Sequence, residues 1–165
     1  MNDIEKIYNL AVAGVQQLIP YKAGKPIEEL ERELGLTRII KLASNENPLG
    51  PGKKVLAAIK SALPALALYP DGSGFALKQA LSGKYAVDVS QITLGNGSNE
   101  ILELVARAFL TPEHEVIFSQ HAFAVYPIVT QAVGAIPVVV PALNYGHDLD
   151  AMLCAVTEKT RLVFI

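Results

Sequence analysis

The sequence predicts an α/β fold in which a mainly parallel sheet is flanked by helices. Two observations lead to this prediction. In the second half of the chain, short apolar segments alternate with longer segments of helical periodicity. Two of the apolar segments, "EVIFS" and "IPVVV", lack the regular polar alternation of a half-exposed strand. Such runs are typical of parallel strands that are covered on both faces.

Two helices are predicted near the start of the chain. The first extends from about Asp3 to Leu18, where apolar residues recur on one helical face. The second occupies "KPIEELERELG", in which Pro26 suits the first helical turn and Gly35 suits the position after the last one.

The middle of the chain is predicted to contain one strand and two helices. "RIIKLAS" has the composition of a short strand, and "NENPLGPG" after it is a dense turn. A helix from about Lys53 to Leu63 follows, and the turn "ALYPDGSG" separates it from a helix from about Phe75 to Tyr85.

From residue 91 onward, strands and helices alternate. Strand "QITL" leads through a glycine turn to a helix from Ser98 to Leu110. Strand "EVIFS" leads to a helix across "FAVYPIVTQAV" that ends at Gly134, and strand "IPVVV" leads to a helix from about Asp148 to Thr157. Asp148 suits the N-cap of that helix, and "RLVFI" begins a further strand.

The composition is that of a folded domain with part of its surface covered. The 165 residues are 51% hydrophobic and only 18% charged, whereas about 25% charged is typical of soluble domains. The apolar excess predicts contact with another domain or subunit. A formal net charge of −2 disfavours binding to nucleic acid or to an anionic lipid surface.

No targeting, membrane or metal signal is found in the sequence. No apolar stretch reaches about 18 residues, and the first residues include acids where a secretory signal would be basic and then apolar. Cys154 and the three histidines lack metal-ligand spacing. A cytoplasmic protein without a metal site is therefore expected.

The segment "LGNGSNE" combines the features of an anion-binding turn. Gly95 and Gly97 allow backbone amides to approach a ligand closely, at the point where a helix begins. The helix dipole adds about 0.3–1 kcal/mol for a bound negative charge. Ser98 contributes a hydroxyl donor and Asn99 an amide donor.

Two common nucleotide motifs do not fit this turn. Glu100 occupies the place of the third glycine of a dinucleotide fingerprint, and no acid ends the following strand "EVIFSQ". No Gly-Lys-Ser or Gly-Lys-Thr follows, which excludes a P-loop. A single small phosphate group remains as the candidate ligand, and a tight turn without a ligand is the alternative.

Three further segments place this turn in a wider pattern. "LASNENPLGP", "YPDGSG" and "LGNGSNE" occur in this order, and an aromatic pair in "HAFAVYP" follows. Together they resemble the fold-type-I pyridoxal-phosphate (PLP) aminotransferases and, within them, the histidinol-phosphate aminotransferases. The resemblance covers the chain from about Tyr21 onward. It implies an N-terminal helical arm with a piece of the small domain in residues 1–40, and the first, incomplete part of the large PLP-binding domain in residues 41–165, truncated at Ile165.

The resemblance implies roles for residues around the cofactor. Gly97, Ser98 and Asn99 would hold the cofactor phosphate. Phe123 would stack on the pyridine ring, where relatives often have Tyr, and Tyr69 would reach the phosphate of the neighbouring subunit's cofactor in a homodimer. Each aromatic has a local alternative, because Phe123 could be helix core and Tyr69 could pack within its own turn.

The resemblance also implies a substrate-facing group. Tyr21, Asn45 and Asn47 would lie where the N-terminal portion closes over the substrate, although a Pro-Tyr pair such as Pro20-Tyr21 is common after a helix. His121 departs from the Pro-rich form that is frequent in this loop of the family, which changes the approach to the ring.

No catalytic residue is assigned within the sequence. The family's Schiff-base lysine follows a Ser or Thr, and no Ser-Lys or Thr-Lys occurs here, so the resemblance places that lysine beyond Ile165. The chain alone is therefore expected to be an inactive fragment, and its uncovered apolar surface predicts poor solubility.

The implied reaction of the parent enzyme is transamination between L-histidinol phosphate and 2-oxoglutarate, giving glutamate, in histidine biosynthesis. An aminotransferase for aromatic amino acids and a threonine-phosphate decarboxylase are close alternatives, because they share the phosphate turn and the stacking aromatic. A non-catalytic α/β module that binds a phosphorylated metabolite through "GNGSNE" is the alternative from a different class.

Overall fold

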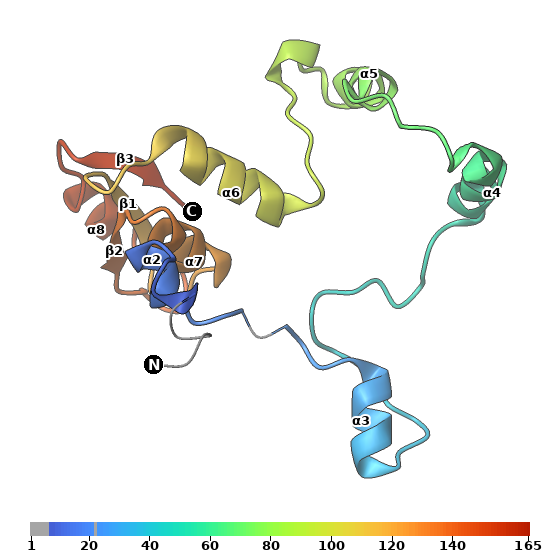
Figure 1. Ribbon diagram of the computed structural model, residues 1–165, viewed down its shortest axis with the longest axis horizontal. Helices are drawn as coiled ribbons and strands as arrows, with labels where there is room; N and C mark the ends of the chain where they lie inside the picture. The colour runs from blue at the N-terminus through green and yellow to red at the C-terminus, as the bar shows by residue number, and fades with distance from the viewer. Residues whose placement is uncertain (1–6, 22) are drawn as a thin grey trace. The chain divides into compact units, whose positions relative to one another are not determined.

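The computed structural model describes residues 7–21 and 23–165, which form two units. The first unit combines residues 7–21 with Thr93–Ile165, and the second comprises residues 23–92. Figure 1 shows the elements of each unit in the colour order of the chain.

The first unit is built on a three-stranded parallel sheet with the order β2-β1-β3. The strands are β1 (Glu115–Ser119), β2 (Ile136–Val140) and β3 (Thr160–Val163). The predicted parallel sheet and all three of these strands are confirmed. The central strand β1 is buried from its second residue onward, as its apolar sequence requires.

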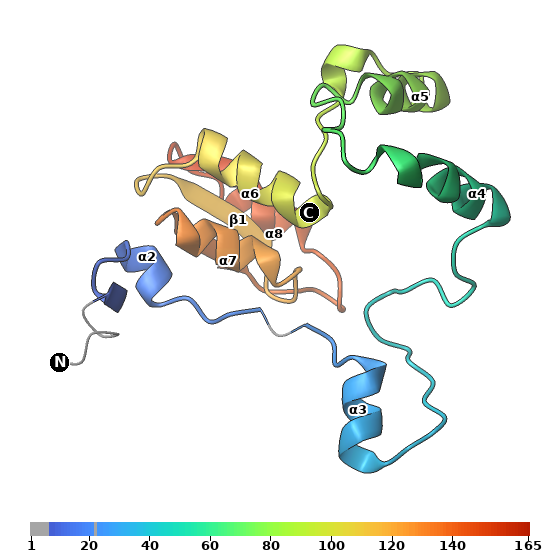
Figure 2. The same cartoon turned by 45° about the vertical axis from the view of Figure 1, so that its right-hand side comes forward.

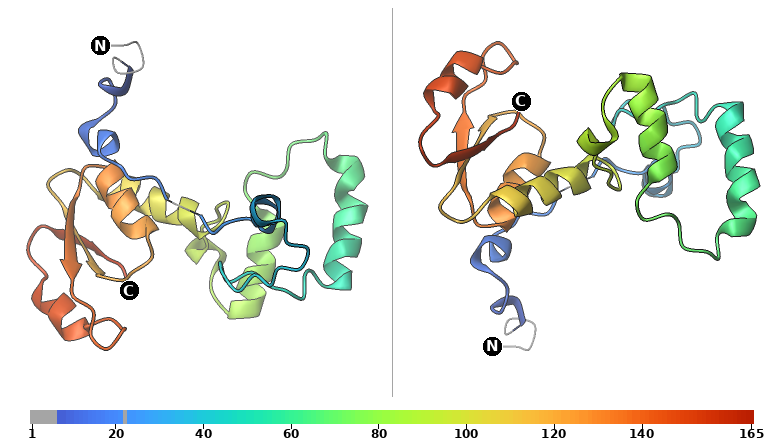
Figure 3. Two further views of the ribbon diagram at one scale, coloured as in Figure 1. Left: turned by 90° about the horizontal axis from the view of Figure 1, so that it is seen from below. Right: turned by 90° about the horizontal axis from the view of Figure 1, so that it is seen from above.

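Helices cover both faces of this sheet (Figure 3). On one face lie α6 (Ser98–Phe109) and α7 (Val125–Ala132), and on the other lies α8 (Leu149–Cys154). Successive β1 residues alternate between two cores, as expected for a strand. The first core contains Ala106, Leu110, Val116, Phe118, Val125, Val129 and Ala135, and the second contains Ile117, Val140 and Met152.

Capping and packing explain the helix positions in this unit. The side chain of Asp148 accepts a hydrogen bond from the Ala151 amide at 2.9 Å, which confirms the predicted N-cap of α8. The helix predicted across "FAVYPIVTQAV" starts two residues late, because α7 begins only at Val125 and Phe123 lies in the preceding loop.

The predicted helix from Asp3 to Leu18 is wrong in its described part; residues 3–6 lie outside the described residues. The chain turns at residues 9–11 and then forms the short α2 (Ala13–Gln16), whose N-cap Val12 is extended. Gly14 lowers the helix propensity in this region, and packing of α2 on α7 replaces the long amphipathic helix.

The second unit contains helices joined by turns. They are α3 (Ile27–Leu34), α4 (Lys53–Ala62), η1 (Leu63–Ala65), α5 (Phe75–Tyr85) and η2 (Val89–Gln91). The three predicted α-helices are confirmed, and Gly35 ends α3 in the left-handed conformation at φ 64°. None of these helices contains a buried residue.

Two predicted strands do not form. "RIIKLAS" and "QITL" are irregular or extended, and in the described part of the chain neither has a neighbouring strand. An apolar segment becomes a strand only when a partner satisfies its backbone groups. Ile40 and Leu42 are instead 86% and 94% exposed.

Candidate functional site

Gly95 and Gly97 shape the turn before α6 for different reasons. Gly97 is the N-cap residue of α6 with φ 85° and ψ 172°, a conformation that is essentially restricted to glycine. A Cβ atom on Gly97 would meet nothing within 4 Å, so the backbone conformation alone requires glycine there. A Cβ atom on Gly95 would lie 2.9 Å from both the Glu100 carboxylate and the Ile101 side chain, so these two side chains would have to shift to admit it.

The turn presents unpaired backbone donors. Gly97 N–H donates to the Gly95 carbonyl at 2.9 Å, which closes the turn on itself. Among the described residues, no group accepts a hydrogen bond from the backbone N–H groups of Ser98, Asn99 or Glu100. These are the first amides of α6, where helix geometry leaves donors without partners and the dipole favours an anion.

Glu100 braces the same turn and was not identified from the sequence. Its Oε2 atom accepts a hydrogen bond from the Asn96 backbone amide at 2.6 Å, and the Asn96 side-chain amide lies 3.5 Å away. The carboxylate therefore holds the loop before Gly97 and leaves the amides of Ser98 and Asn99 without an internal acceptor. A Glu at the third helical position that reaches back to the preceding loop is the pattern that could have revealed it.

Phe123 lies in the loop between β1 and α7 and is 43% exposed, so it is not helix core. Its ring makes edge-to-face contacts with Tyr21 (centroids 6.4 Å apart, 72°) and Tyr126 (6.0 Å, 89°). Tyr126 in turn stacks on Phe164 at 4.5 Å and 11°. Both contacts have the edge-to-face geometry that aromatic quadrupoles favour.

A pocket of about 250 Å³ adjoins Phe123. It lies where the three strands end, beside Ser119 of β1 and Ile165 after β3, and parallel α/β sheets bind ligands at this edge. Its lining consists of Ser119, His121, Ala122, Phe123, Tyr126, Ala142, Tyr145, Gly146, His147 and Ile165. Within the described ranges, no group of three or more metal-ligating side chains could hold a metal ion.

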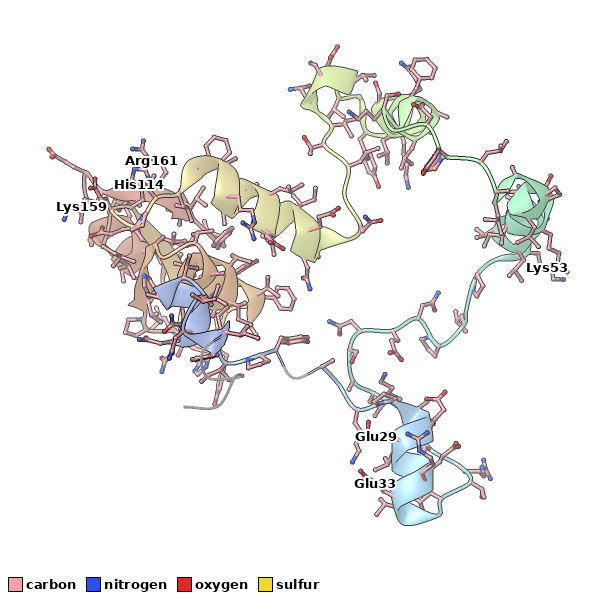
Figure 4. The ribbon with its side chains drawn as sticks, in the orientation of Figure 1. Glu29, Glu33, Lys53, His114, Lys159 and Arg161 are labelled. Atoms are coloured by element: carbon pink, nitrogen blue, oxygen red, sulfur yellow. The ribbon has the colours of Figure 1, made fainter. Side chains whose placement is uncertain are left out.

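A group of polar residues lies at the opposite end of the sheet, where the strands begin, and is separate from this pocket. His114 precedes β1, and its Nε2 atom lies 3.1 Å from Nη2 of Arg161 in β3 (Figure 4). Lys159 lies at the same end of β3, and it is the one lysine in the described part of the first unit. No described lysine of that unit therefore lies at the pocket edge.

The structure brings Tyr21 and Phe123 together in the first unit, which also contains the Gly97–Asn99 turn, and it places only three predicted residues, Tyr69, Asn45 and Asn47, in the second. Tyr69 is fully exposed, and Asn45 adopts the left-handed conformation at φ 52°. The Asn47 side chain folds its own turn, because Oδ1 accepts from the Leu49 amide at 3.0 Å and Nδ2 donates to the Gly50 carbonyl at 3.2 Å. The substrate and cofactor roles of these three residues stay predictions.

The "YPDGSG" turn of the second unit is organised by Asp71. Its carboxylate accepts hydrogen bonds from the Ser73 hydroxyl at 2.8 Å, the Ser73 amide at 2.9 Å and the Phe75 amide at 3.1 Å. The Ser73 hydroxyl, followed by the two amides, holds the pKa of Asp71 below its usual value. The turn therefore fixes the start of α5, six residues after Tyr69.

In the part of the chain that the structure describes, no helix has the length and apolar character needed to cross a membrane.

Comparison with known proteins gives one family. Residues 37–165 match the family model described as aminotransferase class I and II. The chain is 63% identical over 158 residues to histidinol-phosphate aminotransferase 2 of Pseudomonas fluorescens, covering 94% of this chain and 43% of the relative. It is 60% identical over 152 residues to histidinol-phosphate aminotransferase 1 of Idiomarina loihiensis, covering 92% of this chain and 41% of the relative. The chain thus spans about two fifths of the length of these curated relatives.

Solved structures agree with this family. The crystal structure of histidinol-phosphate aminotransferase from Sinorhizobium meliloti in complex with pyridoxal-5'-phosphate superposes with a TM-score of 0.80 at 27% identity, covering 91% of this chain and 40% of that chain. Aspartate aminotransferase from Rhizobium meliloti gives a TM-score of 0.63 at 19% identity over 81% of this chain and 36% of that chain, which supports the fold alone.

Proposed function

Because the chain belongs to the aminotransferase class I and II family, we propose that it forms the phosphate-holding and ring-stacking part of a PLP-dependent aminotransferase. The proposed reaction exchanges an amino group between L-histidinol phosphate and 2-oxoglutarate in histidine biosynthesis, in the cytoplasm. The names of relatives at 60% and 63% identity support this substrate over aromatic amino acids and threonine phosphate.

The observation that carries the proposal is the set of unpaired amides at the start of α6. A phosphate monoester fits this turn, because Ser98 and Asn99 offer backbone N–H groups, Ser98 adds a hydroxyl, and Gly97 places no side chain in the way. The residues present therefore fit the cofactor's phosphate. When bound, pyridoxal phosphate supplies an electron sink for chemistry at the substrate's amino-bearing carbon.

The aromatic residues would position the ring and exclude water. Phe123 is held by two aromatic contacts and keeps part of its surface exposed, and in the proposed site that surface would cover one face of a planar ring. Tyr21 contacts Phe123 and would close the same side over the substrate.

The residues of the second unit complete the proposed site. Tyr69 would reach the cofactor phosphate of a partner subunit in a homodimer, and its full exposure makes its hydroxyl available for that contact. Asn45 and Asn47 would face the substrate from the "NENP" turn.

The proton-carrying lysine of the reaction is proposed to lie outside the 165 residues. Lysine is the residue that both anchors this cofactor and moves its proton, and no lysine in the sequence follows a Ser or Thr. The chain by itself is accordingly expected to bind pyridoxal phosphate but not to catalyse the reaction.

Ligand binding by the chain tests the proposal directly. Equilibrium dialysis should show saturable binding of pyridoxal phosphate and at least about tenfold weaker binding of pyridoxal, which lacks the phosphate. Ser98→Ala should reduce the discrimination between the two. Equal binding of both vitamers, or binding that ignores Ser98, would contradict the proposed phosphate site.

Substrate choice is tested on the proposed full-length enzyme, of which this chain would form part. Its keto-product formation from histidinol phosphate, phenylalanine and threonine phosphate should be compared at equal concentration, with 2-oxoglutarate as acceptor. We expect histidinol phosphate to give the highest kcat/KM. A preference for phenylalanine, or carbon dioxide release from threonine phosphate, would replace the proposed substrate.

A further inference from the structure

A glycine contact holds the N-terminal segment of the first unit against α7. Gly14 of α2 lies on the last turn of α7, and the two elements pack together. A Cβ atom built on Gly14 would overlap the carbonyl oxygen of Gln131 and would lie 3.2 Å from its carbonyl carbon and 3.4 Å from the Gly134 amide nitrogen. All three atoms belong to backbone, so no side-chain rotation can make room.

The same segment meets the other end of α7 through Tyr21. Tyr21 and Phe123 make an edge-to-face contact, and Phe123 lies two residues before α7 begins. Phe123 also packs against Tyr126 in the first turn of α7. The eight residues of α7 are about 12 Å long, and the seven steps from Gly14 to Tyr21 can span up to about 25 Å. Residues 14–21 therefore run along α7 from its end to its start, and Figure 2 shows this part of the chain beside α7.

We propose that Gly14 is a positioning residue: its close contact with the last turn of α7 places residues 14–21 so that Tyr21 covers Phe123. The role of Tyr21 toward substrate rests on the proposed function, whereas the placement of Tyr21 by Gly14 does not. Helix propensity and packing make opposite demands at Gly14. Alanine is the better helix former, yet its methyl group forces α2 away from α7.

A tryptophan reporter tests the placement. The chain contains no tryptophan, so Tyr21→Trp introduces a single fluorophore at the contact with Phe123. The reporter is measured alone, with Gly14→Ala, and with Gly52→Ala as the matched control. Gly52 has φ −66°, and a Cβ atom there would meet nothing within 4 Å.

Acrylamide quenching of the reporter is the readout, with far-UV circular dichroism recorded on each variant. Gly14→Ala should raise the quenching constant about twofold, because Tyr21 is 51% exposed when it is packed and becomes fully exposed when it is released. Gly52→Ala should leave the quenching constant unchanged. Unchanged quenching in Gly14→Ala would overturn the proposal.

A deletion of residues 1–17 decides the case in which Gly14→Ala loses its circular dichroism signal. The deletion removes the contact with α7 without adding an atom to it, so the reporter should again become fully accessible. A reporter that stays shielded after the deletion would overturn the proposal. No cofactor is present in either assay, so a failure to bind pyridoxal phosphate would count against the proposed function and leave this result standing.

Discussion

The two units of the chain differ in what holds them together. The first unit has two buried clusters around β1, formed by residues far apart in sequence. The second unit has well-formed helices but no buried residue in any of them. Tyr69, Leu42 and Leu49 of the second unit are each more than 90% exposed. Tertiary packing therefore stabilises the first unit, whereas helix caps and turn hydrogen bonds shape the second.

The largest expected effect comes from truncating an isoleucine side chain that is buried in the first unit and exposed in the second. Ile117→Ala should lower the free energy of unfolding by about 2–5 kcal/mol, because Ile117 is fully buried in the central strand. Ile59→Ala, at a residue of α4 that is 53% exposed, should change it by no more than about 0.5 kcal/mol. Urea unfolding followed by circular dichroism measures both. Similar losses for the two variants would remove the contrast between the units.

Much of the fold follows from the sequence because its determinants are local or strongly apolar. Gly35 ends α3, Asp148 caps α8, and Glu115–Ser119 forms an apolar parallel strand, all as predicted. The failures depend on partners distant in sequence. "QITL" and "RIIKLAS" have the composition of short strands, yet in the described residues no strand lies beside either segment.

The features of the candidate site also divide into those that the sequence reveals and those that require the structure. The glycine turn is recognisable from Gly97 and Ser98 because its chemistry is contained in a few consecutive residues. The Gly14 contact is not recognisable, since it depends on where a backbone carbonyl lies in space. The Glu100 brace has only one sequence signal, a Glu at the third helical position, and the amide that it reaches is known only from the structure. The placement of Phe123 in a loop also required the structure, because its sequence continues the apolar pattern of α7.

The next largest effect is expected from replacing a glycine by alanine, which should destabilise the first unit and stabilise the second. Gly97→Ala should cost about 1–3 kcal/mol, because φ 85° with ψ 172° strains any L-residue. Gly83→Ala lies inside α5 with open space around its Cβ atom, and it should stabilise that helix by about 0.5–1 kcal/mol. Thermal unfolding measures both changes.

The same pair of variants separates strain from ligand binding. Gly97→Ala should also weaken pyridoxal phosphate binding by about tenfold or more, because relaxing the turn moves the Ser98 and Asn99 amides. Gly83→Ala should leave binding unchanged. Unchanged binding in Gly97→Ala would mean that the turn does not hold the phosphate.

A smaller effect concerns pH and the turns of the second unit. The Asp71 pKa is lowered by the Ser73 hydroxyl first, and then by the amides of Ser73 and Phe75. A lowered pKa means that the associated stability is present above the unfolded-state value of about 3.9 and is lost as the pH falls through the folded-state pKa. Side-chain carboxyl titration by NMR should therefore give a value below the usual one, and Ser73→Ala should raise it. A pKa that is indifferent to Ser73→Ala would show that the hydroxyl does not hold this turn.

The smallest expected effect is the loss of a surface ion pair, and here the two units should behave alike. Arg107 in α6 bonds the Glu103 carboxylate at 2.8 and 2.9 Å, and Lys25 pairs with Glu29 and Glu33 beside α3. All of these side chains are more than 40% exposed, so Arg107→Gln should lower the free energy of unfolding by no more than about 0.5 kcal/mol, and Lys25→Gln should also have only a small effect. Both effects should disappear at high salt. Urea unfolding at low and high ionic strength measures the difference.

Equal, salt-sensitive losses would mean that exposed charges contribute alike to both units and that only the burial of apolar side chains distinguishes the stability of the two units. A loss in Arg107→Gln above about 1 kcal/mol that persists at high salt would instead show that the Arg107 stem contributes through packing on α6, and the contrast between the units would then extend to their surfaces.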